Sequence, residues 1–236
     1  MCILNIENLF ECVIKEKVNR FVVKVKKNEG TYLVHNANTG RLEELLIKGR
    51  KALCKPLKNP SKTSFRLFAV EMDGGYAVID TSLQEAAFEK AVEKGAISYL
   101  RGCNVVRRNL RIGNSTFDFL LDCGEKRIVV ETKSAVLKSE DGFGMYPDCP
   151  TKRGRRHIRE LMKLAKEGYH TLLLFIVAFP DAKGFKPYKK GDPELYKLLK
   201  VSIPDNMMVK SIGIDFDVKS SCVRIYSDDL KVVLQP

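Results

Sequence analysis

The segment that most limits the possible folds is an unbroken apolar run from Leu172 to Phe179, which stops at Pro180. At eight residues it is far shorter than the roughly 18 apolar residues that a membrane-spanning helix needs. A strand of this composition has no polar face, so both of its faces have to be buried, as they are in parallel sheets covered by helices. The run therefore predicts an α/β fold with a buried strand and argues against a membrane protein.

Short strands separated by turns occupy the chain before this region, from Phe10 to about Tyr76. The segments with strand composition are FECVIKEKV, FVVKVKK, TYLVHNA, KALCKPL, SFRLFAVE and YAVID. Turn residues such as Gly30 and Pro60 separate them, and helical periodicity is nearly absent. Such a series predicts a small antiparallel barrel, of which the oligonucleotide-binding (OB) fold is the commonest five-stranded kind.

Helices and strands alternate after Asp80. SLQEAAFEKAVEKG predicts a helix that Thr81 or Ser82 caps and Gly95 ends. Three strands, a long loop and a basic helix follow, in the segments NVVRRNLRIG, STFDFLLDC, KRIVVETKSAVL and KRGRRHIRELMKLAKEG. Since one domain takes roughly 150 residues, we expect two: an OB-like barrel over residues 1–80 and an α/β (α+β) mixed-sheet domain over residues 81–236.

The charge balance points to a polyanionic partner. With 41 Lys and Arg against 29 Asp and Glu, the chain carries a formal charge of +12. Each Lys or Arg that neutralises a phosphate releases a condensed counterion, so nucleic acid is the favoured partner, although the charge can also serve solubility alone.

The cysteines and the amino terminus predict a cytoplasmic protein. The seven cysteines are scattered, odd in number and never spaced as C-x-x-C, which favours reduced thiols over disulfides or a zinc site. Glu7 and Glu11 interrupt the first apolar stretch, and no basic leader precedes it, which argues against a cleaved signal peptide.

Two strands with period-2 alternation flank a Cys-Gly-Glu-Lys turn in STFDFLLDCGEKRIVVETK. If the turn is centred between Gly124 and Glu125, Asp118 faces Glu131 across the hairpin, with Cβ atoms about 4.5 to 5.5 Å apart. Like-charge repulsion makes this pair unfavourable unless a cation lies between the two carboxylates. Lys133 lies on the same strand face as Glu131, because side-chain direction repeats every second residue.

Two carboxylates, the intervening carbonyl of Thr132 and an ammonium group are the components of metal-assisted phosphodiester hydrolysis. Asp118, Glu131 and Thr132 would hold the cation, and Lys133 would position or deprotonate the attacking water. Oxygen ligands without histidine favour Mg²⁺ or Mn²⁺ over zinc. The alternative is that Lys133 only neutralises two solvated acids.

The same hairpin segments, STFDFLLD and VVETKSAVL, belong to a longer pattern. Its other parts are HNANTGRLEELLIKG, MYPDCPTKRGRRHIREL and LFIVAFPDAKGFKPYKKGDPEL. Together these motifs resemble the sugar fermentation stimulation protein (SfsA) family, whose second domain belongs to the PD-(D/E)XK nuclease-like superfamily. The resemblance implies an OB-like domain followed by a restriction-endonuclease-like domain, DNA binding, and a metal-dependent catalytic site at Asp118, Glu131 and Lys133.

Three further acids have open roles. Glu85 or Glu89, on the helix before the three strands, could supply another carboxylate, as such helices do in the superfamily, or be plain helix surface. Asp148 follows the Glu-x-Lys strand, whereas the acid of the superfamily motif should precede it, so Asp118 fits that position better. Asp148 can still line the site from the loop.

The basic helix is the main candidate for DNA contact. Its basic residues recur at helical spacing along one face, opposite Ile158 and Leu161, with Glu160 as the single acid. The predicted contacts are Lys152, Arg153, Arg155, Arg156, His157, Arg159 and Lys163. The alternative is an ordinary solvated face. Such contacts would bind phosphates and position DNA without recognising bases.

His35 and Arg41 are a second candidate site for a phosphate. They flank Asn38 or Thr39, which could cap a short helix over Leu42 to Ile47, and a helix start offers amide groups to an anion. A purely structural turn between the two domains is an equally good interpretation.

Two functions compete. The first is a DNA-binding protein with a Mg²⁺- or Mn²⁺-dependent nuclease site, and the second is a non-catalytic DNA-binding regulator that keeps the same fold. A third, a protein-binding or small-molecule-binding module with an incidental basic surface, predicts no salt-dependent affinity for DNA.

Overall fold

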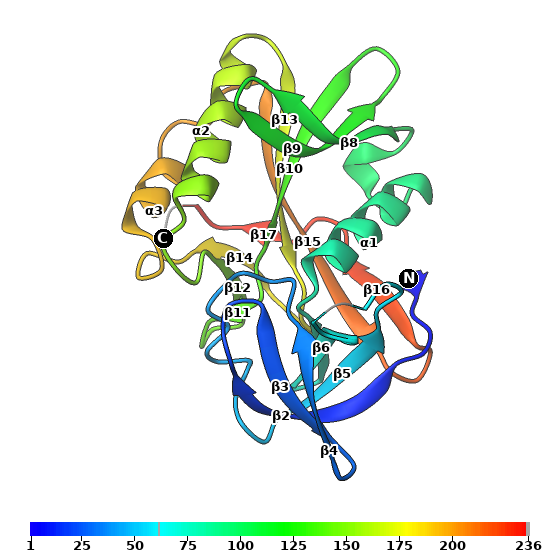
Figure 1. Ribbon diagram of the computed structural model, residues 1–236. Helices are drawn as coiled ribbons and strands as arrows, with labels where there is room; N and C mark the ends of the chain where they lie inside the picture. The colour runs from blue at the N-terminus through cyan, green and yellow to red at the C-terminus, as the bar shows by residue number, and fades with distance from the viewer. Residues whose placement is uncertain (61, 235–236) are drawn as a thin grey trace.

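The first part of the chain folds into a closed five-stranded barrel in the computed structural model, which describes residues 1–60 and 62–234 (Figure 1). Its strands are β2 (Phe10–Lys17), β3 (Val22–Lys27), β4 (Gly30–His35), β5 (Lys51–Pro56) and β6 (Phe65–Met72). They pair in the order β4-β3-β2-β5-β6, and a parallel pairing of β4 with β6 closes the barrel. The predicted OB-like barrel is therefore confirmed.

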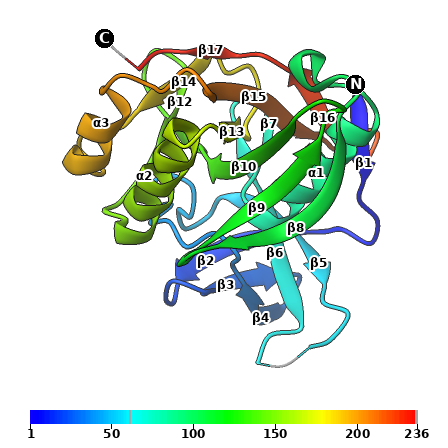
Figure 2. The same cartoon turned by 90° about the horizontal axis from the view of Figure 1, so that it is seen from above.

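The second part is a mixed sheet with helices on both faces (Figures 1 and 2). Its main strands are β8 (Asn104–Ile112), β9 (Ser115–Asp122), β10 (Arg127–Ser134), β13 (His170–Val177), β15 (Met207–Asp217) and β16 (Cys222–Ser227). Helix α1 (Thr81–Glu93) packs against β8 and β10, and α2 (Lys152–Lys166) packs against β13 beside α3 (Pro193–Leu199). A short 3₁₀ helix, η1 (Ser98–Leu100), follows α1. The predicted α/β (α+β) class is confirmed.

The two parts share one continuous sheet. Strand β7 (Gly75–Val78) pairs with β6 of the barrel and also with β15. Strand β1 (Cys2–Asn5) is not part of the barrel and pairs instead with β16 of the second part. A smaller sheet consists of β11 (Leu137–Lys138), β12 (Phe143–Tyr146), β14 (Gly184–Pro187) and β17 (Lys231–Val232).

The central strands agree with the pattern of their residues. Strand β13 is parallel to both β10 and β15, and every residue from Thr171 to Val177 is buried, as the apolar run predicts. The β9–β10 hairpin has the predicted register, with Asp122 opposite Arg127 and Phe119 opposite Val130. Helix α1 covers one face of β10 and α2 covers the other. Side chains on both faces of this strand are therefore buried, including Val129 and Glu131 on the face toward α2.

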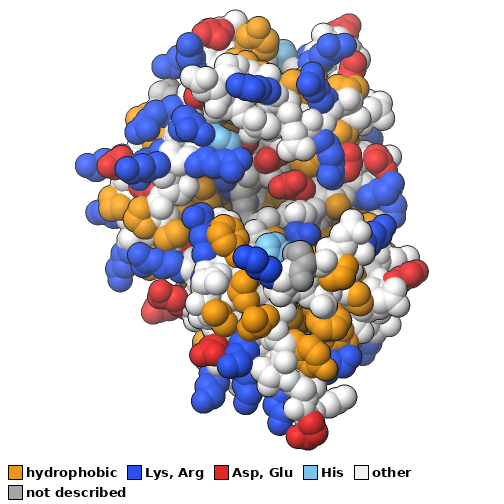
Figure 3. All heavy atoms as spheres, viewed as in Figure 1, with side chains coloured by type: hydrophobic (Ala, Val, Ile, Leu, Met, Phe, Trp, Pro, Cys, Tyr) orange, Lys and Arg blue, Asp and Glu red, His pale blue; other side chains and the backbone are white. Residues whose placement is uncertain are grey.

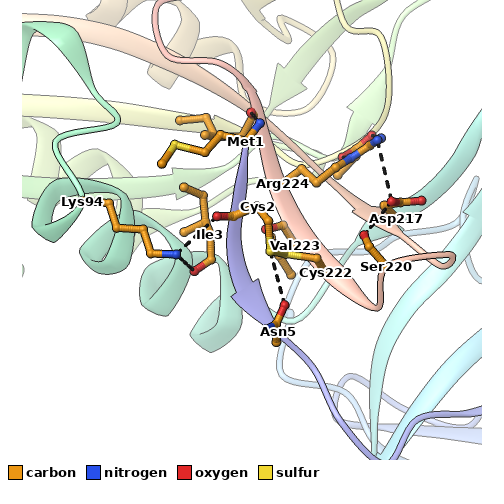
Figure 4. The surroundings of a disulfide bond; sticks show 12 residues. Met1, Cys2, Ile3, Asn5, Lys94, Asp217, Ser220, Cys222, Val223 and Arg224 are labelled. Atoms are coloured by element: carbon orange, nitrogen blue, oxygen red, sulfur yellow. Dashed lines mark hydrogen bonds and ion pairs between the residues drawn. A yellow bond between two sulfur atoms is a disulfide. The ribbon is translucent and has the colours of Figure 1, made fainter.

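Four cysteines form disulfides, so the prediction of seven reduced thiols is wrong. Figure 4 shows Cys2 of β1 bonded to Cys222 of β16, and a second bond joins Cys103 to Cys123. The Cys2–Cys222 pair is 220 residues apart in sequence and meets only because β1 joins the sheet of the second part. Among the described residues, no helix is long and apolar enough to cross a membrane.

Asp80, rather than the predicted Thr81 or Ser82, caps α1. Its carboxylate accepts hydrogen bonds from the amides of Ser82 and Leu83, at 3.1 and 3.3 Å. The same carboxylate, which is fully buried, binds the guanidinium of Arg66 on β6 at 2.6 Å. Burial raises the pKa of Asp80, and the Arg66 charge opposes that rise. One side chain thus fixes the start of α1 to the barrel wall.

We predict that Asp80→Ala lowers the free energy of unfolding by about 3 kcal/mol, because it removes the cap and leaves the Arg66 charge without its partner. Urea denaturation at pH 7 measures this loss. Asp80→Asn keeps a cap acceptor and should lose less, and Ser82→Ala, which only removes a hydroxyl from Arg66, should lose under about 1 kcal/mol. An equal loss in Ser82→Ala would contradict the assignment of the cap to Asp80.

Candidate functional site

A cleft of about 990 Å³ lies between the barrel and the mixed sheet. The barrel contributes its turn at Arg20 and Phe21 and the segment Ala37 to Leu45, and the second part contributes residues of α1, β9, β10 and α2. Figure 3 shows the hollow near the middle of one face, with basic side chains around it and acidic ones inside. Asp118, Glu131, Thr132 and Lys133 all line this cleft.

Asp118 is held by the neighbouring strand. The hairpin ladder ends at the Phe119–Val130 pair. Beyond that pair, Asp118 Oδ2 accepts hydrogen bonds from the amide and the hydroxyl of Thr132, at 2.7 and 2.6 Å. Burial, and after it the charge of Glu131, raises the pKa of Asp118. These bonds occupy only one carboxylate oxygen and leave Oδ1 for another partner.

Glu131 is a buried carboxylate, 2% exposed, with two very different oxygens. Its Oε1 accepts hydrogen bonds from the Lys133 ammonium and from Nδ1 of His157, the latter at 2.6 Å. Burial opposes ionisation, but Lys133 and His157 together hold the pKa of Glu131 below its usual value. Its Oε2 is buried and has no hydrogen-bond partner within residues 1–60 and 62–234, although buried carboxylate oxygens are normally satisfied.

The free oxygens and the main chain together fit a divalent cation. Asp118 Oδ1, Glu131 Oε2 and the carbonyl of Thr132 are hard oxygen donors of the kind that Mg²⁺, Mn²⁺ and Ca²⁺ prefer. Within the described part of the chain, no three His, Cys, Asp or Glu side chains cluster as a ligand set. Two carboxylates and a carbonyl, which is the predicted set, are therefore what the protein can offer to a cation here.

The Lys133 ammonium lies at the same place. It donates to Glu131 Oε1 and, at 3.1 Å, to the carbonyl of Thr132. Although burial disfavours its charge, the Glu131 carboxylate raises the pKa of Lys133 above its ordinary value. Lys133 is therefore a fixed cation beside the acids. A protonated ammonium suits the predicted positioning of a water molecule and the alternative of simple neutralisation, but not the deprotonation of that water.

The two candidate glutamates of α1 have different surroundings. Glu89 forms an ion pair with Arg108 at 2.6 Å, whereas Glu85 lines the cleft with Asp118 and Glu131. Burial, followed by the charge of Asp118, raises the pKa of Glu85 to about 7. Both residues lie one helical turn apart on the same side of α1, so only the docking of the helix decides which one faces the site.

His157, predicted as a DNA contact, lies beside Glu131 rather than on the exposed face of α2. It is 3% exposed, and besides its bond to Glu131 it accepts a hydrogen bond at Nε2 from Nε of Arg153, at 3.4 Å. That acceptor role leaves the proton on Nδ1, so His157 donates to Glu131. Its spacing to Leu161 and Leu164 on the apolar face of α2 was the signal that could have indicated a buried position.

The exposed face of α2 carries the basic stripe, defined here as Lys152, Arg156, Arg159 and Lys163, together with Lys166. Lys152 and Arg153 also line the cleft. Arg155 lies off the stripe, because Asp192 and Glu194 of the α3 segment bind its guanidinium at 2.6 and 3.2 Å. The stripe therefore begins at the cleft and continues along the helix.

The segment between His35 and Gly49 joins the two parts of the molecule. The predicted helix over Leu42 to Ile47 is wrong: residues 43–45 form a turn, and Leu42 has a left-handed φ of 51°, which a right-handed helix does not allow. Asp148 accepts a hydrogen bond from the Leu42 amide at 3.0 Å. Arg41 is exposed and lines the cleft, while His35 lies on β4 and is absent from the cleft wall. Asp148 thus lines the cleft as a link between the parts.

The fold and the site together define a class of protein: an OB-like barrel is followed by a mixed-sheet domain. The cleft between them is lined by Asp118, Glu131 and Lys133, an acidic site of the Glu-x-Lys type. Two family models match the chain, the SfsA N-terminal OB domain over residues 16–79 and the sugar fermentation stimulation protein RE domain over residues 82–220. The chain belongs to the sugar fermentation stimulation protein (SfsA) family.

Relatives match along almost the whole chain. A sugar fermentation stimulation protein homolog of Pyrococcus furiosus is 43% identical over 98% of this chain and 99% of the relative. One of Archaeoglobus fulgidus is 44% identical over 99% of this chain and 100% of the relative. A solved structure of Pyrococcus furiosus SfsA in complex with Ca²⁺ superposes with a TM-score of 0.93 at 42% identity, covering 98% of this chain and 99% of that one.

We predict that Glu85→Gln changes the pH dependence of stability. A carboxyl group whose folded-state pKa rises from 4.5 to about 7 stabilises the folded protein most at low pH and loses this effect as the pH rises through that interval. The free energy of unfolding of Glu85→Gln, relative to that of wild type, should therefore rise by on the order of 1–2 kcal/mol between pH 4.5 and 8. Urea denaturation at three pH values with a chelator measures the difference.

Glu89→Gln is the matched control, because it removes a carboxylate from the same helix but breaks the ion pair with Arg108. It should show no gain at high pH. If both variants follow the wild-type pH profile, Glu85 does not experience the charges of Asp118 and Glu131.

Proposed function

We propose that this protein binds DNA in the cleft and along the basic stripe, and that its acidic site hydrolyses phosphodiester bonds with the help of Mg²⁺ or Mn²⁺. The observation that carries the proposal is Glu131 Oε2, a buried carboxylate oxygen without a hydrogen-bond partner among the described residues. Glu131 lines, together with Asp118, a cleft whose lining also includes Lys152 and Arg153.

The residues of the site have distinct roles in this proposal. Asp118, Glu131 and the Thr132 carbonyl would hold the cation, which when bound polarises the phosphoryl oxygen and lowers the pKa of coordinated water. His157 orients Glu131 by binding Oε1, so that Oε2 faces the cation site. Lys133, which donates a hydrogen bond to Glu131, would orient a water molecule beside the cation.

The relative supports an oxygen-rich cation site. The solved structure of Pyrococcus furiosus SfsA is a complex with Ca²⁺, a cation that takes carboxylate and carbonyl oxygens as ligands. Asp118, Glu131 and Thr132 offer that chemistry in this chain, and Mg²⁺ and Mn²⁺ share the preference for oxygen.

A non-catalytic DNA-binding regulator is the second candidate. It is favoured by one observation: the Lys133 ammonium already bridges Glu131 and the Thr132 carbonyl, and so balances the buried charge without a metal. In that case the basic stripe and the cleft would account for the whole function.

We expect the purified protein to nick supercoiled plasmid in Mg²⁺ or Mn²⁺ and not in a chelator. Glu131→Gln should slow nicking by about 100-fold or more, because it removes the charge of a cation ligand. Glu29→Gln, an equal charge change on the β3–β4 turn, should leave the rate unchanged. If the protein binds DNA in a salt-sensitive way with or without metal but never nicks it, the non-catalytic regulator is favoured instead.

We also expect the double variant Arg156→Ala, Arg159→Ala to bind DNA more weakly at all sequences. Each phosphate contact contributes about 0.9 to the slope of log affinity against log salt, so the slope should fall by roughly 1.8 if both residues contact phosphate. Fluorescence anisotropy with a labelled duplex over a range of salt measures it. Lys126→Ala with Arg127→Ala has the same charge change and should leave the slope unaltered. Lys126 is on the β9–β10 turn and Arg127 is the first residue of β10, and neither lines the cleft.

A further inference from the structure

The turn between β2 and β3 presents an aromatic side chain at the edge of the cleft. Phe21 is 50% exposed, and both Phe21 and its neighbour Arg20 line the cleft opposite the acidic site. The Arg20 guanidinium lies 5.7 Å from the centre of the Phe21 ring. A single exposed apolar residue needs no explanation by itself. A functional role for Phe21 therefore has to be argued from the residues around it.

The backbone of this turn is held rigidly. The carbonyl of Phe21 accepts the amide of Asn36 at 2.8 Å, and the Phe21 amide donates to the side chain of Asn19 at 2.8 Å. Asn36 is fully buried and also donates through Nδ2 to the carbonyl of Arg20, at 3.3 Å. The half-exposed ring is therefore presented by an ordered turn rather than by a loose loop.

A chain of amide contacts connects this turn with the strand of Glu131. Asn36 Nδ2 donates to the carbonyl of Asn38 at 2.6 Å, and Asn38 Nδ2 contacts the hydroxyl of Ser134 on β10 at 3.4 Å. Gln84 of α1 donates to the same hydroxyl at 2.9 Å. The Asn36 and Asn38 motif thus fixes the separation between Phe21 and the acidic site across the two domains.

The chemistry of the cleft favours a nucleic-acid strand as the occupant. In OB folds, the loop between the first and second barrel strands contributes to oligonucleotide binding, and here that loop is the β2–β3 turn with Phe21. Basic residues for phosphates stand on both walls: Arg20 and Arg41 on the barrel, and Lys152 and Arg153 on α2. Aromatic rings between such cations stack on bases, which are accessible only where the bases are unpaired.

We propose that Phe21 stacks on an unpaired base of the DNA strand in the cleft, and that the protein consequently prefers single-stranded DNA, or DNA with unpaired bases, to a perfect duplex. The inference rests on the proposed DNA-binding function and specifies its substrate class. Stacking contributes affinity without base identity, so the preference concerns the structure of the DNA and not its sequence.

The absence of tryptophan from the sequence allows a direct test. Phe21→Trp introduces a single indole that keeps the aromatic face, and its emission should be quenched when a thymidine oligonucleotide binds in the presence of a chelator. Val18→Trp is the matched control: Val18 is 49% exposed on the same turn but does not line the cleft, so its emission should change little. Anisotropy with a labelled oligonucleotide verifies that both variants bind.

Phe21→Leu keeps an apolar side chain and removes the aromatic face. It should weaken binding of the oligonucleotide by about 5- to 100-fold while leaving duplex binding within about twofold of wild type. Circular dichroism confirms that each variant is folded, and the two tryptophan variants provide an independent measurement.

The outcomes separate the inference from the function on which it rests. Suppose that the oligonucleotide binds in a salt-sensitive way, but the indole emission of Phe21→Trp does not change or Phe21→Leu keeps wild-type affinity. Either result would overturn the stacking role and leave DNA binding intact. Equal losses for oligonucleotide and duplex would overturn the preference for unpaired bases. If the wild-type protein binds neither DNA, the proposed function fails and the inference fails with it.

Discussion

The burial of Glu131 is the constraint on which the rest of the site depends. A carboxylate that is 2% exposed in the middle of a sheet is tolerated only if cations and hydrogen-bond donors offset its desolvation. Lys133 on the same strand and His157 on the covering helix both donate hydrogen bonds to Glu131 Oε1, and Lys133 also brings a positive charge. Since these partners come from β10 and α2, the docking of α2 and the ionisation of Glu131 stabilise each other.

The position of α2 is in turn secured at its amino-terminal end. Asp192 accepts hydrogen bonds from the amide of Thr151 and from the guanidinium of Arg155, at 2.9 and 2.6 Å, and also caps α3. The helix is therefore fixed on one side by Arg155 and directed toward Glu131 by His157. Only its outer face is left to carry the basic stripe, which explains why residues from one basic segment have such different environments.

Local patterns predict the parts of this structure that depend on local chemistry. The register of the β9–β10 hairpin follows from a short turn, so the placement of Asp118, Glu131 and Lys133 near one another could be derived from spacing. The position of Glu85, the buried side of His157 and the Cys2–Cys222 disulfide depend on how distant elements pack. Helical spacing could have placed His157 on the buried face of α2, but not beside Glu131. The docking of α1 and the pairing of β1 with β16 have no signal in the periodicity of any one segment.

The distribution of charge within the cleft has a consequence for how a strand could bind there. Asp118, Glu131 and Glu85 lie inside it, whereas Arg20, Arg41, Lys152 and Arg153 stand on its walls. A phosphate is attracted to the walls but repelled by the acids, because the single charge of Lys133 offsets only part of theirs. A divalent cation on the acids reverses the sign of that repulsion. Under the proposed function, binding of DNA to the walls is therefore independent of metal, whereas approach of a phosphate to Asp118 and Glu131 requires the cation.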